Sequence, residues 1–361
     1  MQGRIGRVIL PILVTVLVTG LLSSCGFHRK YENPIAKDTV QPDKMLFDKA
    51  ISDLERGRYD VARLTLQTLI GTYDSSEFLA KAKLALADSW FREGGAAGLA
   101  NAEAEYKDFI LFYPMLEEAS EAQEKVCLLH YRQMDKPDRD ADQAMKADQE
   151  CRAVIEQFPN SKFAPQAQQY VRNIQEVLAE SEYRTGSFYY NKKSFVAAAS
   201  RFQGLTDHYP LFSNADDALW KQGDSYSHLG TRFSPQATEA YSRILQFYPL
   251  SIHADAARKR LASLEQPIPE PDPVAAARMK YELANQDKPG VFSHFWGIFR
   301  SRPDVSMAAK SGTPATTVLR PAVPVSITFQ TPAAGEVGSD VTVSTVPDTG
   351  TSDATPQLQP R

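Results

Sequence analysis

An aromatic residue followed by proline recurs along this chain at the end of stretches with helical periodicity, and no other feature constrains the fold as strongly. The pairs are Tyr113-Pro114, Phe158-Pro159, Tyr209-Pro210 and Tyr248-Pro249, with Tyr73-Asp74 as a fifth copy that has Asp in place of Pro. Twelve residues before the last member of each pair stands an alanine, and eight before it a larger residue. The alanines are Ala62, Ala102, Ala147, Ala198 and Ala237, and the larger residues are Leu66, Tyr106, Cys151, Phe202 and Tyr241. With a further apolar residue five before, this pattern indicates one face of a helix that ends where proline cannot continue it.

The spacing resembles the second helix of a tetratricopeptide repeat, in which Ala, Phe and a closing Pro stand at the same separations. The copies lie 40, 45, 51 and 39 residues apart. The ordinary repeat has 34 residues, so we expect extended first helices or loops, with turn-rich sequence at 92–98 and 135–140 supplying loops. The prediction is an all-α solenoid of about five tetratricopeptide-like helix pairs over residues 42–265, closed by a helix over 252–264. Such a stack buries a continuous core and leaves a concave face for peptides.

The C-terminal part of the chain has a different composition. Prolines at alternate positions from 267 to 273 predict an extended spacer, and residues 274–286 have the pattern of a short helix. Residues 266–302 are therefore assigned to a Pro-rich spacer and an aromatic amphipathic segment. Residues 303–361 are rich in Thr, Ser, Pro, Val and Ala, which predicts a disordered tail.

The N-terminal residues have the pattern of an export signal. Arg4 and Arg7 precede an apolar stretch over residues 8–22, and the run 22–25 (LSSC) resembles a lipobox. We expect residues 1–24 to be a lipoprotein signal peptide, Cys25 to carry diacylglycerol and further acyl chains such as palmitate, and 25–41 to be a linker. Two or three acyl chains suffice for stable anchoring. An ordinary cleaved signal and a buried Cys25 are the alternatives.

Charge and motifs argue against catalysis. The chain has 40 Lys and Arg against 44 Asp and Glu, so nothing indicates a nucleic-acid surface. It contains no phosphate-binding loop, no HExxH and no CxxC pair, and its histidines are scattered singly. We therefore expect no enzyme, no metal site and no cofactor other than the covalent lipid on Cys25.

Two further cysteines, Cys127 and Cys151, lie on adjacent predicted helices of the third repeat. Antiparallel helices bring two thiols together if their faces match, and an exported protein permits disulfides. Because Cys151 holds the large-residue position, a buried thiol that only packs is the alternative.

Residues 291–300 (VFSHFWGIFR) place four large aromatic side chains at helical spacing, namely Phe292, Phe295, Trp296 and Phe299. After a Pro-rich spacer such a segment has no core of its own. It can fold back onto the last repeat, dock into a partner's groove or lie in the membrane interface. We treat the four aromatic residues as candidate partner-binding residues.

A lipobox followed by about five long repeats, the first with Gly57-x-Tyr59-x-x-Ala62, resembles the BamD family, also called YfiO or ComL. The resemblance covers roughly residues 20–265. It implies a non-catalytic lipoprotein of the outer-membrane β-barrel assembly machine, whose partners are a BamA-like barrel insertase, other assembly-machine lipoproteins and unfolded outer-membrane proteins. Gly26 replaces the Asp that retains such lipoproteins in the inner membrane, which favours the periplasmic face of the outer membrane.

The resemblance also implies residue roles. An Arg followed three residues later by Gly before a Tyr-Pro pair maps onto Arg201, so Arg201 is expected to bind the insertase, although a solvated helix face would show the same pattern. The first repeats of the family hold unfolded substrate, and the corresponding residues here are Tyr59, Trp90, Phe91 and Tyr106, unless they are core.

Two other functions are compatible with a helical repeat. One is a periplasmic adaptor that coordinates cell-wall synthesis with envelope integrity, but such adaptors usually lack a lipid anchor. The other is a cell-wall enzyme built on a helical scaffold. That enzyme needs a catalytic globular domain, which the sequence after Pro267 does not supply.

Overall fold

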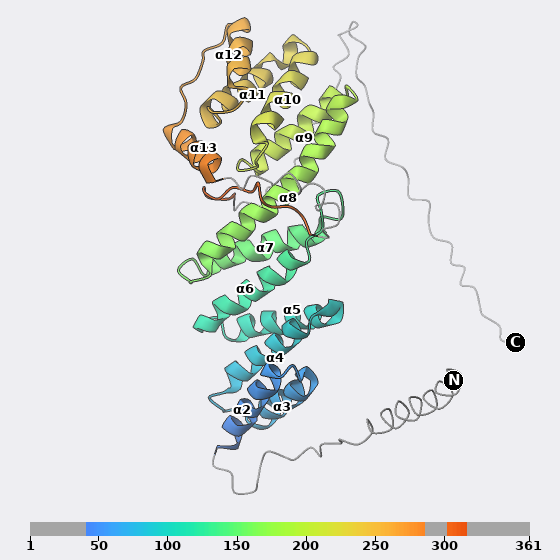
Figure 1. Ribbon diagram of the computed structural model, residues 1–361, viewed down its shortest axis with the longest axis vertical. Coiled ribbons are helices and arrows are strands. Elements are labelled where there is room, and N and C mark those ends of the chain that lie inside the picture. The colour runs from blue at the N-terminus through green and yellow to red at the C-terminus, as the bar shows by residue number, and fades with distance from the viewer. Residues whose placement is uncertain (1–40, 286–301, 316–361) are drawn as a thin grey trace, which may run out of the picture. The chain divides into compact units, whose positions relative to one another are not determined.

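The computed structural model describes residues 41–285 and 302–315, and within them every regular element is helical (Figure 1). Ten helices form five consecutive pairs, and each helix packs on the next along the chain. The pairs are α2 (Pro42–Glu55) with α3 (Tyr59–Thr72), α4 (Leu79–Glu93) with α5 (Gly95–Phe112), α6 (Glu117–Arg132) with α7 (Asp142–Gln157), α8 (Ala164–Asn191) with α9 (Phe195–His208), and α10 (Ala215–His228) with α11 (Ser234–Phe247). A short 3-10 helix, η1 (Thr231–Phe233), precedes α11, and α12 (Ala254–Ser263) and α13 (Pro273–Asn285) follow it. The predicted all-α array of five helix pairs is confirmed.

In each helix pair, the second helix ends at the aromatic residue of the repeated aromatic-Pro or aromatic-Asp motif. Each of these residues has φ between −123° and −133°, and its backbone N–H donates to the carbonyl four residues earlier. A residue before proline is pushed out of the helical region by the proline ring, which explains four of the five ends. The aromatic pair therefore marks the true helix ends.

The core follows the repeat unit. Five apolar clusters lie along the chain, and each consists of a second helix between the first helix of its own pair and the next one. The repeated alanines and the larger residues eight before the anchor are at most 1% exposed. The apolar stripe of each second helix thus faces two neighbouring helices, and no pair buries its core alone.

Two glycines show how closely the helices approach. A Cβ on Gly186 of α8 would lie 2.8 Å from the Phe202 ring, and a Cβ on Gly223 of α10 would lie 2.6 Å from the Tyr241 ring. The large repeat residue of the second helix therefore packs against a glycine on the first helix in the last two pairs.

One of the two loops predicted to account for the extra length of the repeats is present in the structure, and the other is not. Residues 135–140 form the predicted loop between α6 and α7. Residues 92–98 do not, because only Gly94 separates α4 from α5, and α5 extends over 18 residues. Positive φ at Gly94 and Gly95 makes the reversal within two residues. The longest spacing is explained by α8, which has 28 residues.

The C-terminal part contains more structure than its composition indicates. Beyond α12 the chain is extended, as the spacer predicts, and α13 contacts α11. Residues 302–315, most of which were assigned to the disordered tail, lie against α8 and α13 and hydrogen-bond to both. The described residues 303–315 thus depart from the predicted disordered tail, because side chains of α8 and α13 hydrogen-bond to their main chain. Residues 1–40, 286–301 and 316–361 lie outside the described residues.

Candidate partner-binding surfaces

Arg201 lies on the exposed side of α9. Its Nη1 donates to Glu182 Oε2 on α8 at 3.1 Å, and its side chain is 48% exposed. The next residue, Phe202, is fully buried, because consecutive helical residues point about 100° apart. The structure thus places Arg201 at the surface, directly beside a core position.

A second arginine, which is half-buried, reaches the same helix α9 from α11. Arg243 of α11 donates to Asp207 Oδ1 at 2.7 Å and to the Thr206 carbonyl at 2.9 Å. An exposed ion pair such as Arg201–Glu182 contributes about 0–1 kcal/mol to folding, so Arg201 is not required for the fold. The Arg201 guanidinium is consequently available to a partner that supplies carboxylates, whereas Arg243 is held between Asp207 and the Thr206 carbonyl.

Trp90 and Phe91, at the end of α4, are half-buried and are covered by cations. The Arg63 guanidinium lies 3.7 Å from the Trp90 ring centroid and also donates to Glu93 Oε2 at 2.6 Å. The Phe91 ring has the Arg132 guanidinium at 5.1 Å and the Lys125 ammonium at 5.9 Å. Arg63 is only 7% exposed and packs against Trp90 within the fold, whereas Lys125 and Arg132 of α6 supply positive charge nearer the surface. We call Trp90 and Phe91 of α4 together with Lys125 and Arg132 of α6 the cation–aromatic surface.

Tyr106 does not belong to this surface, although the family resemblance suggested it. It is fully buried in the core, and its hydroxyl donates to Asp88. Burial and the neighbouring Asp88 carboxylate raise the pKa of the phenol above its ordinary value. The physical reason is its position eight residues before the Pro, where the repeat requires a large core residue. Tyr59 is half-buried and packs against the first apolar cluster.

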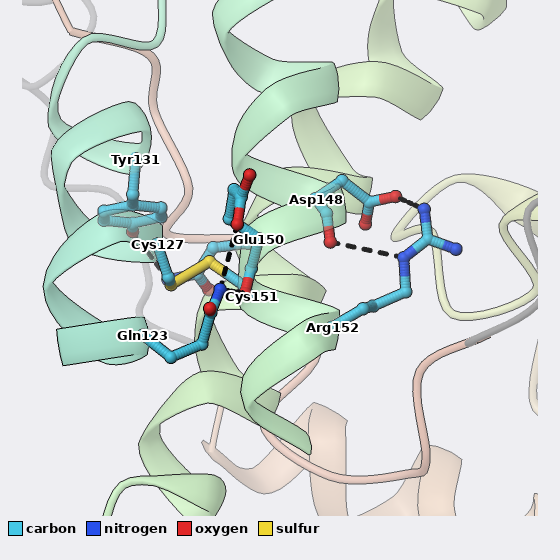
Figure 2. The surroundings of a disulfide bond; sticks show 8 residues. Gln123, Cys127, Tyr131, Asp148, Glu150, Cys151 and Arg152 are labelled. Carbon is cyan, nitrogen blue, oxygen red and sulfur yellow. Dashed lines mark hydrogen bonds and ion pairs between the residues drawn. A yellow bond between two sulfur atoms is a disulfide. The ribbon is translucent and has the colours of Figure 1, made fainter. Parts of the chain in front are cut away.

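Cys127 of α6 and Cys151 of α7 are joined by a disulfide in the structure, and both are fully buried (Figure 2). Beside it, Gln123 Nε2 donates to the Glu150 backbone carbonyl at 3.1 Å and to the Glu150 carboxylate at 2.9 Å. The disulfide therefore covalently links the two helices of the third pair.

On the same helix α7, Asp148 forms a buried ion pair with Arg152 (Figure 2). Burial raises the pKa of Asp148 to about 6, against the effect of the guanidinium. Both side chains of this pair are at most 10% exposed, so it does not contribute to the surfaces described above.

The sequence did not single out Arg63, Arg132 or Glu282. Arg63 occupies the position after the repeat alanine, and the only signal was an arginine beside a position that the pattern predicts to be buried. Cys25 and the aromatic residues Phe292, Phe295, Trp296 and Phe299 lie outside the described residues, so their predicted roles stay predictions.

Within residues 41–285 and 302–315, no helix combines the length and the apolar character needed to cross a bilayer. Over the same stretches, no three His, Cys, Asp or Glu side chains are grouped so as to hold a metal ion.

Five helix pairs with a repeated Ala, large residue and aromatic end, carrying exposed arginines and a cation–aromatic surface, define a tetratricopeptide-like repeat scaffold of the protein-binding class. The model of the family described as YfiO, outer membrane lipoprotein, matches residues 39–240. The chain belongs to the YfiO family.

Relatives with an assigned role are similar over most of their length. The outer membrane protein assembly factor BamD of Xylella fastidiosa (strain Temecula1) is 24% identical over 230 residues, 61% of this chain and 77% of that protein. The protein of the same description from Vibrio cholerae is 26% identical over 218 residues, covering 58% and 88% of the two chains. That from Rickettsia prowazekii is 26% identical over 241 residues, covering 66% and 92%.

Proposed function

We propose that this protein is a non-catalytic scaffold of outer-membrane protein assembly, which binds a BamA-like barrel insertase at one surface and unfolded outer-membrane proteins at another. The family and the description of its relatives as outer membrane protein assembly factors support the assembly role. Arg201 is the observation that supports the insertase contact, since it is half exposed and unnecessary for the core.

The cation–aromatic surface is the proposed site for unfolded substrate. Its aromatic faces bind apolar side chains of an extended chain, and the cations of Arg132 and Lys125 attract carboxylates. Trp90 and Phe91 are the residues that contact substrate in this proposal, whereas Tyr106 supports them from the core.

We propose further that Cys25 carries the lipid anchor, that this lipid is the only attached group, and that the repeats lie at the periplasmic face of the outer membrane. The family description as an outer membrane lipoprotein supports this proposal. Other assembly-machine lipoproteins are expected to bind the same scaffold.

Charge reversal at Arg201 tests the insertase contact. In Arg201→Glu the new carboxylate faces Glu182 and the partner, so co-purification with the insertase is expected to fall, because charge reversal at a contact costs more than its loss. The control is Arg258→Glu on α12, an arginine of similar exposure that pairs with Asp255.

Circular dichroism of both variants should match that of the native chain, since the arginines contribute little to folding. Insertase recovery that is equal for the native chain, Arg201→Glu and Arg258→Glu would contradict the role of Arg201.

A further inference from the structure

Residues 302–315 are held on α8 through their main chain. Three α8 side chains, spaced three residues apart, donate to three carbonyls of the segment that are spaced in the same way. Gln169 Nε2 donates to the Ala309 carbonyl at 3.1 Å, Arg172 Nη1 to the Gly312 carbonyl at 2.8 Å, and Gln175 Nε2 to the Ala315 carbonyl at 2.8 Å. The segment passes across α8 (Figure 1).

The opposite wall of this site is α13. The Glu282 carboxylate accepts hydrogen bonds from the backbone N–H of Lys310 at 2.9 Å and of Ser311 at 2.7 Å, and one from the Ser311 hydroxyl. The donors on α8 bind carbonyls and the acceptor on α13 binds amides. The site therefore satisfies both kinds of main-chain group on one extended strand of polypeptide.

Hydrogen bonds among the α8 side chains help to hold the donors in position. The Arg172 guanidinium also donates to Gln169 Oε1 at 2.8 Å, which holds two of the three donors together. Gln175 is only 5% exposed when the segment is in place, and its side chain also hydrogen-bonds Asp148 of α7, which fixes the position of its amide. The Ala315 carbonyl thus accepts a hydrogen bond from an amide that neighbouring side chains already hold in position.

The side chains of the segment are small where it touches the repeats. Ala308, Ala309 and Pro314 are buried. Gly312 has φ +89°, and a Cβ there would lie 3.0 Å from a Leu211 methyl carbon. The close approach thus selects glycine at this position, while most other recognition is of the main chain.

The segment is not part of the repeat core. None of its residues belongs to the five apolar clusters of the described chain. A cavity of about 200 Å³, lined in part by Ile252, Leu283, Met307 and Ala309, remains beside it. The segment satisfies its main-chain hydrogen bonds but leaves apolar space beside it unfilled. A ligand that also filled this space would gain van der Waals contacts and could displace the segment.

We propose that α8 and α13 form a binding site for an extended polypeptide with small side chains and a glycine, and that residues 308–315 occupy it as a tethered ligand. A segment of a partner protein with this chemistry binds in its place through the same main-chain hydrogen bonds. The occupant in the free protein is the chain's own segment, which keeps the site closed to weak ligands. This inference is independent of which partners the Arg201 and cation–aromatic surfaces bind.

The test uses the full chain and a fluorescent peptide with the sequence of residues 302–315. Gly312→Val releases the tethered segment, since valine is strained at positive φ and meets Leu211, while the site itself is unchanged. The peptide is expected to bind this variant at least about tenfold more tightly than the native chain, because a tethered copy competes at an effective concentration on the order of millimolar.

Adding Arg172→Ala to Gly312→Val removes a donor of the site and is expected to reverse the gain, whereas adding Arg258→Ala on α12 is expected to leave it. Hydrogen exchange at the Lys310 and Ser311 amides reports whether the segment has left α13. Protection that Gly312→Val does not change, or release without tighter peptide binding, overturns the proposal. A lost melting transition in Gly312→Val also overturns it, since the segment then belongs to the fold.

Discussion

Single residues on facing helices decide how closely this array packs. The repeat alanines and the glycines opposite Phe202 and Tyr241 let aromatic side chains fill the space between helices. The burial of the repeat alanines and of the larger repeat residues could be predicted from the spacing alone, whereas the two glycines could not. The same spacing predicts that Tyr106 is buried, because it occupies the large-residue position of its repeat, and the structure places it in the core. The family resemblance had suggested a surface position.

Gly186→Ala is expected to destabilise the protein by about 1–3 kcal/mol, because the added methyl meets the Phe202 ring in a packed core. Gly204→Ala on α9 is the matched control. A Cβ there has nothing within 4 Å, so helix propensity should stabilise it by up to about 1 kcal/mol. Urea denaturation of both variants measures the difference, and equal effects in the same direction would refute the close-approach account.

Glu176 is expected to make stability depend on pH. It is buried on α8 and accepts hydrogen bonds from the Ser213 backbone N–H, at 3.0 Å, and hydroxyl. Burial raises its pKa to about 7 from 4.5, although the bonds from Ser213 oppose the rise. The folded chain therefore retains a proton that the unfolded chain releases, and the unfolding free energy falls as pH rises between these values.

With about 1.4 kcal/mol for each pH unit, the decrease is on the order of 3 kcal/mol. Glu176→Gln should flatten the curve of unfolding free energy against pH above about pH 6, while Asp148, whose pKa burial raises to about 6, still contributes below that value. Glu156→Gln, at an exposed position on α7 that does not influence Glu176, is the control and should keep the native slope. A native slope in Glu176→Gln would show that this carboxyl ionises freely in the folded state.

At the scale of elements, the disulfide adds a constraint to a helix pair that already packs through an apolar cluster. The two cysteines are 24 residues apart, and closing a loop of this size in the unfolded chain is worth about 3 kcal/mol in the loop-entropy model. The sequence indicated both cysteines and their helices, but the choice between a bond and two packed thiols depends on which faces meet.

Reduction is expected to lower the melting temperature while leaving the helical circular dichroism at low temperature unchanged, because the apolar cluster of the third pair remains. The double variant Cys127→Ala/Cys151→Ala should melt near the reduced native chain and should not respond to the reductant. A native chain whose melting curve is identical with and without reductant, while a thiol assay shows the bond to be open, would contradict a stabilising bond.

Helix lengths show where the sequence stops being informative. A long spacing between two repeats is compatible with a longer helix or a longer loop, and only the structure assigns it to α8 and α5. Residues 302–315 could not be predicted at all, because side chains of α8 and α13 bind their main chain, which is the same in every sequence.

At the scale of the whole molecule, the five apolar clusters all lie between residues 42 and 264. A chain truncated after Gln266 is therefore expected to keep a cooperative melting transition. It should lose part of its affinity for a partner subunit or for lipid vesicles, since it lacks the aromatic residues of 291–300. Binding equal to that of the full chain in both assays would remove the aromatic segment from recruitment.

Anchoring is tested by Cys25→Ser, which offers no thiol for the lipid. The variant is expected in the soluble fraction of the cell envelope, while Ser24→Ala, beside it, should remain with the outer membrane. Complete recovery of Cys25→Ser in the outer membrane would show that another part of the protein attaches it.

The length of α8 has a mechanical consequence. Its first half packs with α7 through Val171, Ile174 and Leu178, and its second half with α9 through Ala179 and Tyr183. A helix of this length spans about 42 Å without a break. Bending it requires opening backbone hydrogen bonds, whereas the short connections elsewhere bend by rotating single bonds. The middle of the array is consequently stiff, and a torque applied at α9 is delivered to α7 instead of being absorbed in a hinge.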